Sequence, residues 1–122
     1  MPKRRDFMDC EIVILVENID VCRYFYRETL GLGEPLQDSS FQVIFKLNEN
    51  TGLVLEKCEM PYLEHASGAC RFSLLPKDGI KSVDRLKDNG VMIEDGFDVS
   101  GRKVYRAADP EGNIFQIICG DY

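Results

Sequence analysis

The residue types that most often carry nucleophilic or metal chemistry are few in this chain and widely spaced. The only histidine is His65, and one histidine without a partner motif cannot form a Ser-His-Asp set. The cysteines are odd in number and lack Cys-x-x-Cys spacing; they are Cys10, Cys22, Cys58, Cys70 and Cys119. Most of them lie in apolar runs, where a free cysteine acts as a small hydrophobic residue. We therefore expect reduced, structural thiols.

Phosphate and nucleic-acid chemistry lack support in the sequence. The pair Gly31 and Gly33 follows a predicted helix rather than a strand, so it lacks the context of a phosphate-binding loop. The basic run at residues 3–5 is short and terminal, which is typical of a solvated tail. Fifteen basic against 21 acidic residues give a formal net charge of -6, and both halves are acidic. We exclude nucleic acid as a partner, because its phosphate backbone requires a basic face.

The size and composition indicate one globular domain. The 122 residues are 44% hydrophobic and 30% charged, enough for a core that needs no disulfide or structural metal. The basic N-terminal residues are followed by Asp6, Asp9 and Glu11 instead of an apolar signal-peptide core. The longest apolar runs, such as 12–16, are too short to span a bilayer. We expect a cytoplasmic protein that does not bind membranes.

The first half predicts a strand, a helix and a β-hairpin. The strand, at 11–16, is rich in β-branched residues. Asn18 is predicted to cap the helix, which ends at Gly31. The hairpin consists of two strands, at 41–47 and 53–58, joined by a turn at 48–52.

Aromatic residues mark one side of the first predicted helix. Helical spacing places Val21, Tyr24 and Phe25 on one face. Together with Tyr26, they are expected to pack in the core and along its edge.

The second half repeats the order after a linker at 61–68. A strand at 70–74 precedes a helix, which Asp78 is predicted to cap and Gly90 to end. That helix carries Ile80, Val83 and Leu86 at three-residue steps. Three strands follow, at 92–99, 102–107 and 114–119, with turns at 100–101 and 109–113.

The order β-α-β-β-β therefore occurs twice. Residues 11–15 match residues 69–73 at an offset of 58, and Gly31 matches Gly90 at 59. The alternative is a ferredoxin-like α+β domain, which also uses β-α-β units. Three strands after each helix favour the duplicated arrangement. We predict a single domain of two modules, at about residues 10–60 and 68–120.

Three segments carry a resemblance to a known superfamily. They are EIVILVENID at 11–20, YFYRETLGLG at 24–33 and DPEGNIFQI at 109–117. Together they resemble the glyoxalase / bleomycin-resistance / extradiol-dioxygenase superfamily, also called vicinal oxygen chelate (VOC) proteins. The resemblance implies an α+β fold of two tandem βαβββ modules whose curved mixed sheets form a cleft, commonly completed by homodimerisation. Its enzymes commonly use a divalent metal as a Lewis acid, whereas other members bind drugs without metal.

The resemblance also implies where metal ligands would lie. In metal-dependent members, the first strand of each module opens on a His, Gln or Glu; here these positions fall on Glu11 and Ala69. The last strand of each module supplies a carboxylate; here the positions fall on Gln116 and on Val54 or Glu56, depending on register. Because Ala69 has no ligand atom, we expect no complete metal site. If a divalent metal is bound, the expected ligands are Glu11, Glu56, His65 and Gln116.

Strand alternation selects the residues that would line the implied cleft. Arg71 is notable among them, since a guanidinium suits a ligand carboxylate or phosphate; alternatively, it pairs with Glu11. Tyr62 and Tyr105 are predicted to flank the cleft and could stack on a ligand. The predicted ligand-binding residues are Arg71, Glu11, Gln116, Ser73, Tyr62 and Tyr105. The residues predicted to pack on the helices instead are Phe72, Leu74, Phe115, Ile117 and Cys119.

These patterns predict a protein that binds or sequesters a small molecule in the cleft. The ligand would be partly apolar and oriented by Arg71, Glu11 and Gln116, without a complete metal site. One alternative is a metal-dependent lyase, isomerase or dioxygenase of the same superfamily. Another is a non-catalytic interaction domain.

Overall fold

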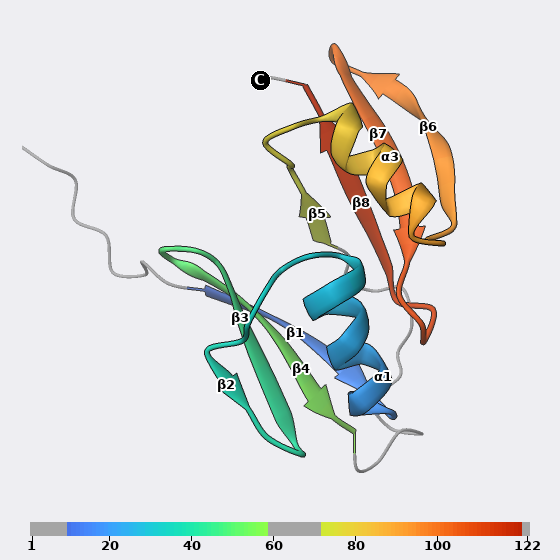
Figure 1. Ribbon diagram of the computed structural model, residues 1–122. Coiled ribbons are helices and arrows are strands. Elements are labelled where there is room, and N and C mark those ends of the chain that lie inside the picture. The colour runs from blue at the N-terminus through green and yellow to red at the C-terminus, as the bar shows by residue number, and fades with distance from the viewer. Residues whose placement is uncertain (1–9, 59–71, 121–122) are drawn as a thin grey trace, which may run out of the picture. The chain divides into compact units, whose positions relative to one another are not determined.

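The structure, a computed structural model, describes residues 10–58 and 72–120 (Figure 1). Contacts divide the chain into two compact units, Met1–Pro61 and Tyr62–Tyr122, and each contains one four-stranded sheet. No helix in the described part of the chain is long and apolar enough to cross a membrane. The linker predicted at 61–68 lies outside the described residues.

The first unit contains one helical segment and one four-stranded sheet of order β1-β4-β3-β2. β1 pairs with β4 in parallel, whereas β3 pairs with both its neighbours antiparallel. The bounds are β1 Cys10–Val16, α1 Ile19–Tyr24, η1 Phe25–Thr29, β2 Gln37–Asp38, β3 Gln42–Asn48 and β4 Thr51–Lys57. The strand β2 is the one that the sequence patterns did not place.

The second unit repeats this topology, with a sheet of order β5-β8-β7-β6 in which only β5 and β8 are parallel. The bounds are β5 Phe72–Leu74, α3 Ile80–Asp88, β6 Ile93–Val99, β7 Arg102–Ala108 and β8 Ile114–Cys119. Both units therefore have the order β-α-β-β-β. This confirms the predicted α+β class with two βαβββ modules, rather than the ferredoxin-like alternative.

The first helix begins at the predicted cap, but only part of its predicted face is buried. The Asn18 side chain accepts a hydrogen bond from the Val21 amide at 3.2 Å, as expected of an N-cap. Val21 and Tyr24, predicted to lie on the packed face, are 46% and 60% exposed. Phe25 and Tyr26 are buried as predicted, and Cys22, which the spacing did not single out, is fully buried as well.

The end of this helix widens into a single π-helical turn, η1. The Leu30 amide donates to the Phe25 carbonyl at 2.7 Å, a five-residue step in place of the usual four. Gly31 then adopts a positive φ of 86°, which ends the helical segment where the sequence predicts.

The second helix starts one residue later than predicted, and Asp78 is not its cap. Gly79 takes the N-cap position with a φ of 55°, and no side chain caps the helix. The Asp78 carbonyl, rather than its carboxylate, accepts from the Lys81 amide at 3.2 Å. Gly79, which has no side chain, therefore occupies the N-cap position that the sequence assigned to Asp78. Val83 and Leu86 are buried as predicted.

Each sheet has a buried face, and in the second unit the predicted packing residues lie on it. Phe72 and Phe115 stack with ring centroids 5.4 Å apart, and Ile117 is buried beside them. Figure 1 shows α3 alongside β7 and β8 of the same unit. Alternate residues of β8 therefore contribute to this core, and the residues between them face the other way.

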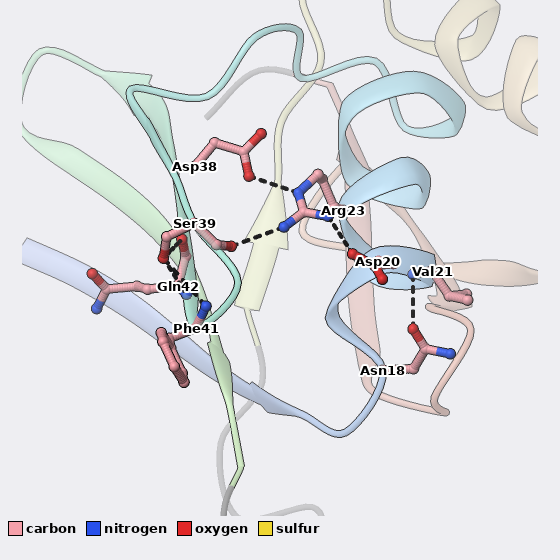
Figure 2. Close-up of polar contacts among 8 residues, drawn as sticks. All are labelled: Asn18, Asp20, Val21, Arg23, Asp38, Ser39, Phe41 and Gln42. Carbon is pink, nitrogen blue, oxygen red and sulfur yellow. Dashed lines mark hydrogen bonds and ion pairs between the residues drawn. The ribbon is translucent and has the colours of Figure 1, made fainter.

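Arg23 joins α1 to the short strand β2, a connection that the sequence did not reveal (Figure 2). Its guanidinium donates to Asp20 at 2.6 Å, to Asp38 at 2.7 Å and to the Ser39 carbonyl at 2.8 Å. The hydrogen bond to Asp20 is the main factor that raises the pKa of Arg23. The planar Arg23 guanidinium thus makes two hydrogen bonds to carboxylates and one to a carbonyl, and these hold the two-residue strand against the helix.

Replacing Arg23 with methionine is expected to loosen β2 without unfolding the unit. The substitution keeps the aliphatic stem but removes all three contacts, at a cost of about 1 kcal/mol. Hydrogen exchange should then be faster at the Ser39 amide, which donates to the Gln42 carbonyl at 3.0 Å. As the control, Lys46→Met breaks an exposed pair with Glu49 and should leave this amide unchanged. Unaltered Ser39 exchange in Arg23→Met would contradict the connection.

Candidate functional site

A row of polar side chains crosses all four strands of the second sheet. Ladder pairing places them side by side: Ser73 pairs with Gln116, Gln116 with Arg106, and Arg106 with Glu94. The Ser73 hydroxyl donates to Gln116 Oε1 at 3.2 Å. At the other end, Arg106 Nη1 lies 4.0 Å from Glu94 Oε2. We call these four residues the polar row.

Apolar residues border the polar row on both sides. Ile114 pairs with Ala108 at one side, and Ile118 pairs with Val104 at the other. These positions are two residues from Gln116 or Arg106 and therefore share their face of the sheet. Since Phe115, between Ile114 and Gln116, belongs to the core, the polar row lies on the face opposite that core. This face thus offers hydrogen-bonding groups flanked by apolar surface, a combination typical of small-molecule sites.

The register of the first sheet identifies the counterpart of Gln116. Glu56 pairs with Leu15, and Gln116 pairs with Ser73. Leu15 and Ser73 differ by 58, which is the offset of the sequence repeat. Of the two candidates at this position, Glu56 is therefore the equivalent one. Val54 lies two residues away on the same face and is buried.

The carboxylates of the first sheet do not converge. Glu11 pairs with Gly52, whereas Glu56 pairs with Leu15. They are thus four ladder steps apart, about 13 Å along the strands at about 3.3 Å per residue. Their side chains stand perpendicular to the sheet, so both cannot approach one ion at the usual metal–oxygen distance of about 2 Å. No side chain stands directly opposite Glu11, because its partner is glycine.

The remaining predicted ligands do not complete a metal site in the described part of the chain. Gln116 is neutral, its oxygen accepts from Ser73, and the cationic Arg106 pairs with it. A neighbouring cation disfavours a divalent ion. Across residues 10–58 and 72–120, no three His, Cys, Asp or Glu side chains are grouped closely enough to hold a metal. The donors described here therefore do not fit a metal; His65 lies outside the described residues.

Tyr105 does not flank the polar row. It pairs with Ile117, so it lies on the core face of the sheet, and only 4% of it is exposed. Lys87 Nζ of α3 lies 6.0 Å from its ring centroid. This placement contradicts the expectation that Tyr105 stacks on a ligand. Alternation along a strand gives two possible faces, and pairing with Ile117 places Tyr105 on the core face.

Arg106 is the residue that the sequence reasoning missed. Its position follows from the length of the turn that joins the two strands of the hairpin. A turn over 109–113 joins Ala108 to Ile114, and counting back two pairs places Arg106 opposite Gln116. Two other predicted residues, Arg71 and Tyr62, lie outside the described residues, as does Ala69.

Asp109 fixes this register by organising the turn that follows β7. Its Oδ1 accepts hydrogen bonds from the Glu111 and Asn113 amides, each at 2.9 Å, and its Oδ2 accepts from the Asn113 side chain at 2.9 Å. The Asp109 amide donates to the Asn113 carbonyl at 3.0 Å. Asp109 is itself buried. The Asp-Pro-Glu-Gly-Asn segment noted in the sequence therefore has a structural role that aligns Arg106 with Gln116.

The four cysteines described here are in no disulfide and have different surroundings. Cys10 is exposed, Cys22 is buried, and Cys58 and Cys119 are intermediate. Burial raises the pKa of the Cys119 thiol above its ordinary value. Because thiolate is the reactive form, a raised pKa leaves less of it at a given pH.

Iodoacetamide is therefore expected to alkylate Cys119 more slowly than Cys10 at pH 8. Raising the pH should narrow the difference in rate, because it converts more of the Cys119 thiol to thiolate. Peptide mass spectrometry of quenched samples gives both rates within one protein. Unfolding in urea provides the control, since it should make the two rates similar. Equal rates in the folded protein at pH 8 would contradict the effect of burial on Cys119.

Several solved structures are similar to this chain over nearly its whole length. No family model matches the sequence, and no curated protein matches it. Among solved structures, the chain is similar to TnmS3, an antibiotic-binding protein from a Streptomyces species, with a TM-score of 0.76 and 20% identity over 99% of this chain and 100% of that one. It is also similar to a lactoylglutathione lyase from Agrobacterium tumefaciens, with a TM-score of 0.75 and 21% identity over 97% and 96%.

A glyoxalase / bleomycin-resistance protein from Catenulispora acidiphila is a third similar structure, with a TM-score of 0.74 and 16% identity over 93% of this chain and 99% of that one. All three similarities extend over nearly whole chains. This chain has the glyoxalase / bleomycin-resistance fold. The resemblance inferred from the sequence is thereby confirmed at the level of the fold.

Proposed function

We propose that this protein binds a small, partly apolar molecule and does so without a complete metal site. The observation that carries the proposal is the face of the second sheet described above. It combines the polar row with apolar borders on the face opposite Phe115 and Ile117. The similar TnmS3 is an antibiotic-binding protein, which supports small-molecule binding as a use of this fold.

A metal-dependent enzyme of the same fold is the less favoured alternative. The similar lactoylglutathione lyase makes it a natural comparison. In this chain, however, Glu11 and Glu56 are too far apart along the ladder, and Gln116 faces Arg106. Fold alone does not determine chemistry, so the donor set decides the preference.

Native mass spectrometry of the purified protein, together with elemental analysis, tests the proposal. We expect a non-covalent organic adduct and no stoichiometric metal, even after incubation with Ni²⁺, Zn²⁺ or Fe²⁺. Gln116→Leu should reduce the adduct, since it removes the central amide at nearly constant volume. Lys103→Gln is the matched control because Lys103 pairs with Cys119 on the other face of β7. Stoichiometric metal, or the absence of any adduct, would contradict the proposal.

We also propose that the protein is a homodimer, as the superfamily resemblance implies. Its ligand site would then be completed by the second copy. Sedimentation equilibrium is expected to give twice the mass of one chain. A monomer that retains the adduct would contradict this part of the proposal but leave small-molecule binding intact.

A further inference from the structure

The polar row also indicates the chemical class of the ligand. We infer that the ligand is an organic monocarboxylate whose carboxylate binds between Arg106 and Gln116. This inference rests on the proposed small-molecule function and makes it specific. The sequence predicted Gln116 as a ligand-binding residue but not Arg106, and Arg71 was the expected anion-binding group.

Arg106 has hydrogen-bond donors available for a ligand. Its distance of 4.0 Å to Glu94 is within ion-pair range but too long for a hydrogen bond. The Arg106 side chain is 42% exposed, so a ligand can reach it. A guanidinium presents several N–H groups in one plane, which matches the two oxygens of a carboxylate.

The Gln116 amide adds donors beside this guanidinium. Its Oε1 is engaged by the Ser73 hydroxyl, which fixes how the amide is turned. The Nε2 group, on the other side of the same amide, then retains its N–H donors for an acceptor. Directly paired residues on neighbouring strands have Cβ atoms about 5 Å apart, so both side chains can contact one carboxylate. The pair thus gathers donors of one kind, as anion recognition requires.

The surroundings favour a carboxylate attached to an apolar body over a phosphate dianion. Glu94 lies at the end of the polar row, and its charge opposes a second negative charge near Arg106. Ile114 and Ile118 each lie two residues from Gln116, about 7 Å along the strand. An aromatic or branched aliphatic group of that length can cover one of them while the carboxylate stays at Arg106. The apolar borders therefore account for the rest of the ligand.

Binding of 2-naphthoate and its neutral analogue 2-naphthamide tests this class by isothermal titration calorimetry. The wild-type protein is expected to bind naphthoate about tenfold more tightly, since hydrogen bonds to a charged group are stronger. In Arg106→Gln, the two affinities should become nearly equal. Lys103→Gln removes the same charge from the same strand but from the opposite face, so it should keep the wild-type preference.

The outcomes separate this inference from the function on which it rests. Equal affinities for naphthoate and naphthamide in the wild type, or an unchanged preference in Arg106→Gln, would overturn the carboxylate class while leaving small-molecule binding in place. If neither probe binds, the composition of the adduct found by native mass spectrometry decides. An adduct without a carboxylate overturns the inference, one with a carboxylate supports it, and the absence of any adduct removes the proposed function as well.

Discussion

Replacement of Gly96 by alanine is expected to destabilise the second unit by about 3 kcal/mol or more. Gly96 lies where the pairing of β6 with β7 shifts between Glu94 and Phe97, a β-bulge that brings the two backbones close together. A Cβ at position 96 would lie 0.9 Å from the Val104 carbonyl oxygen and 2.1 Å from its carbon. No rotamer relieves this overlap, because both atoms belong to the backbone. Either β6 or β7 must move.

Urea denaturation followed by circular dichroism measures the loss, and hydrogen exchange locates it in β6 and β7. Gly52→Ala is the matched control, as Gly52 is also a strand glycine without a positive φ. A Cβ there would meet its nearest atom, the Phe45 carbonyl oxygen, at 3.6 Å, an ordinary contact. That variant should be neutral, or more stable by about 0.5 kcal/mol through reduced freedom of the unfolded chain. Similar stabilities for the two variants would contradict the close approach at the bulge.

The second large effect is expected at Asp109. Asp109→Ala removes the acceptor of two backbone amides and of the Asn113 side chain. Leaving such donors unpaired in a part-buried turn costs about 2 kcal/mol or more. Because this turn aligns β7 with β8, the substitution should also weaken ligand binding at the polar row. Thermal unfolding and the naphthoate titration measure the two consequences separately.

Two variants serve as controls for Asp109→Ala. Asp109→Asn keeps an oxygen acceptor for the two amides and should retain most of the stability. Asp98→Ala removes the same charge from an exposed position on the neighbouring hairpin and should have little effect. If Asp109→Ala were as stable as Asp98→Ala, the turn would not depend on the carboxylate.

Most elements of the fold follow from local sequence patterns, and the exceptions have physical causes. Strands such as β1 and β8 are predictable because they are short apolar runs rich in β-branched residues. The strand β2 has two exposed residues and depends on the contacts that Arg23 makes across the unit. The bulge at Gly96 is likewise invisible locally, because it is defined by the approach of another strand. Tertiary contacts, rather than propensity, position both features.

The candidate site could be predicted in part. Alternation correctly placed Ser73 and Gln116 on one face, and the structure adds the hydrogen bond between them. Arg106 and Tyr105 are adjacent, so a register error of one residue exchanges them between the core and the open face. The turn held by Asp109 settles that register. The sequence therefore identifies polar residues that can line a site, but strand pairing is needed to show which of them share one face of the sheet.

The equivalence of Glu56 and Gln116 shows how the two halves differ in charge on the same scaffold. Corresponding ladder positions hold Leu15, Glu56 and Gln42 in one sheet but Ser73, Gln116 and Arg106 in the other. The same backbone frame thus carries one negative charge in the first half and one positive charge in the second. A repeated scaffold of this kind can carry different chemistry in each half. Because the two sheets have matching ladder positions, residues of one sheet can be introduced by substitution at the corresponding positions of the other.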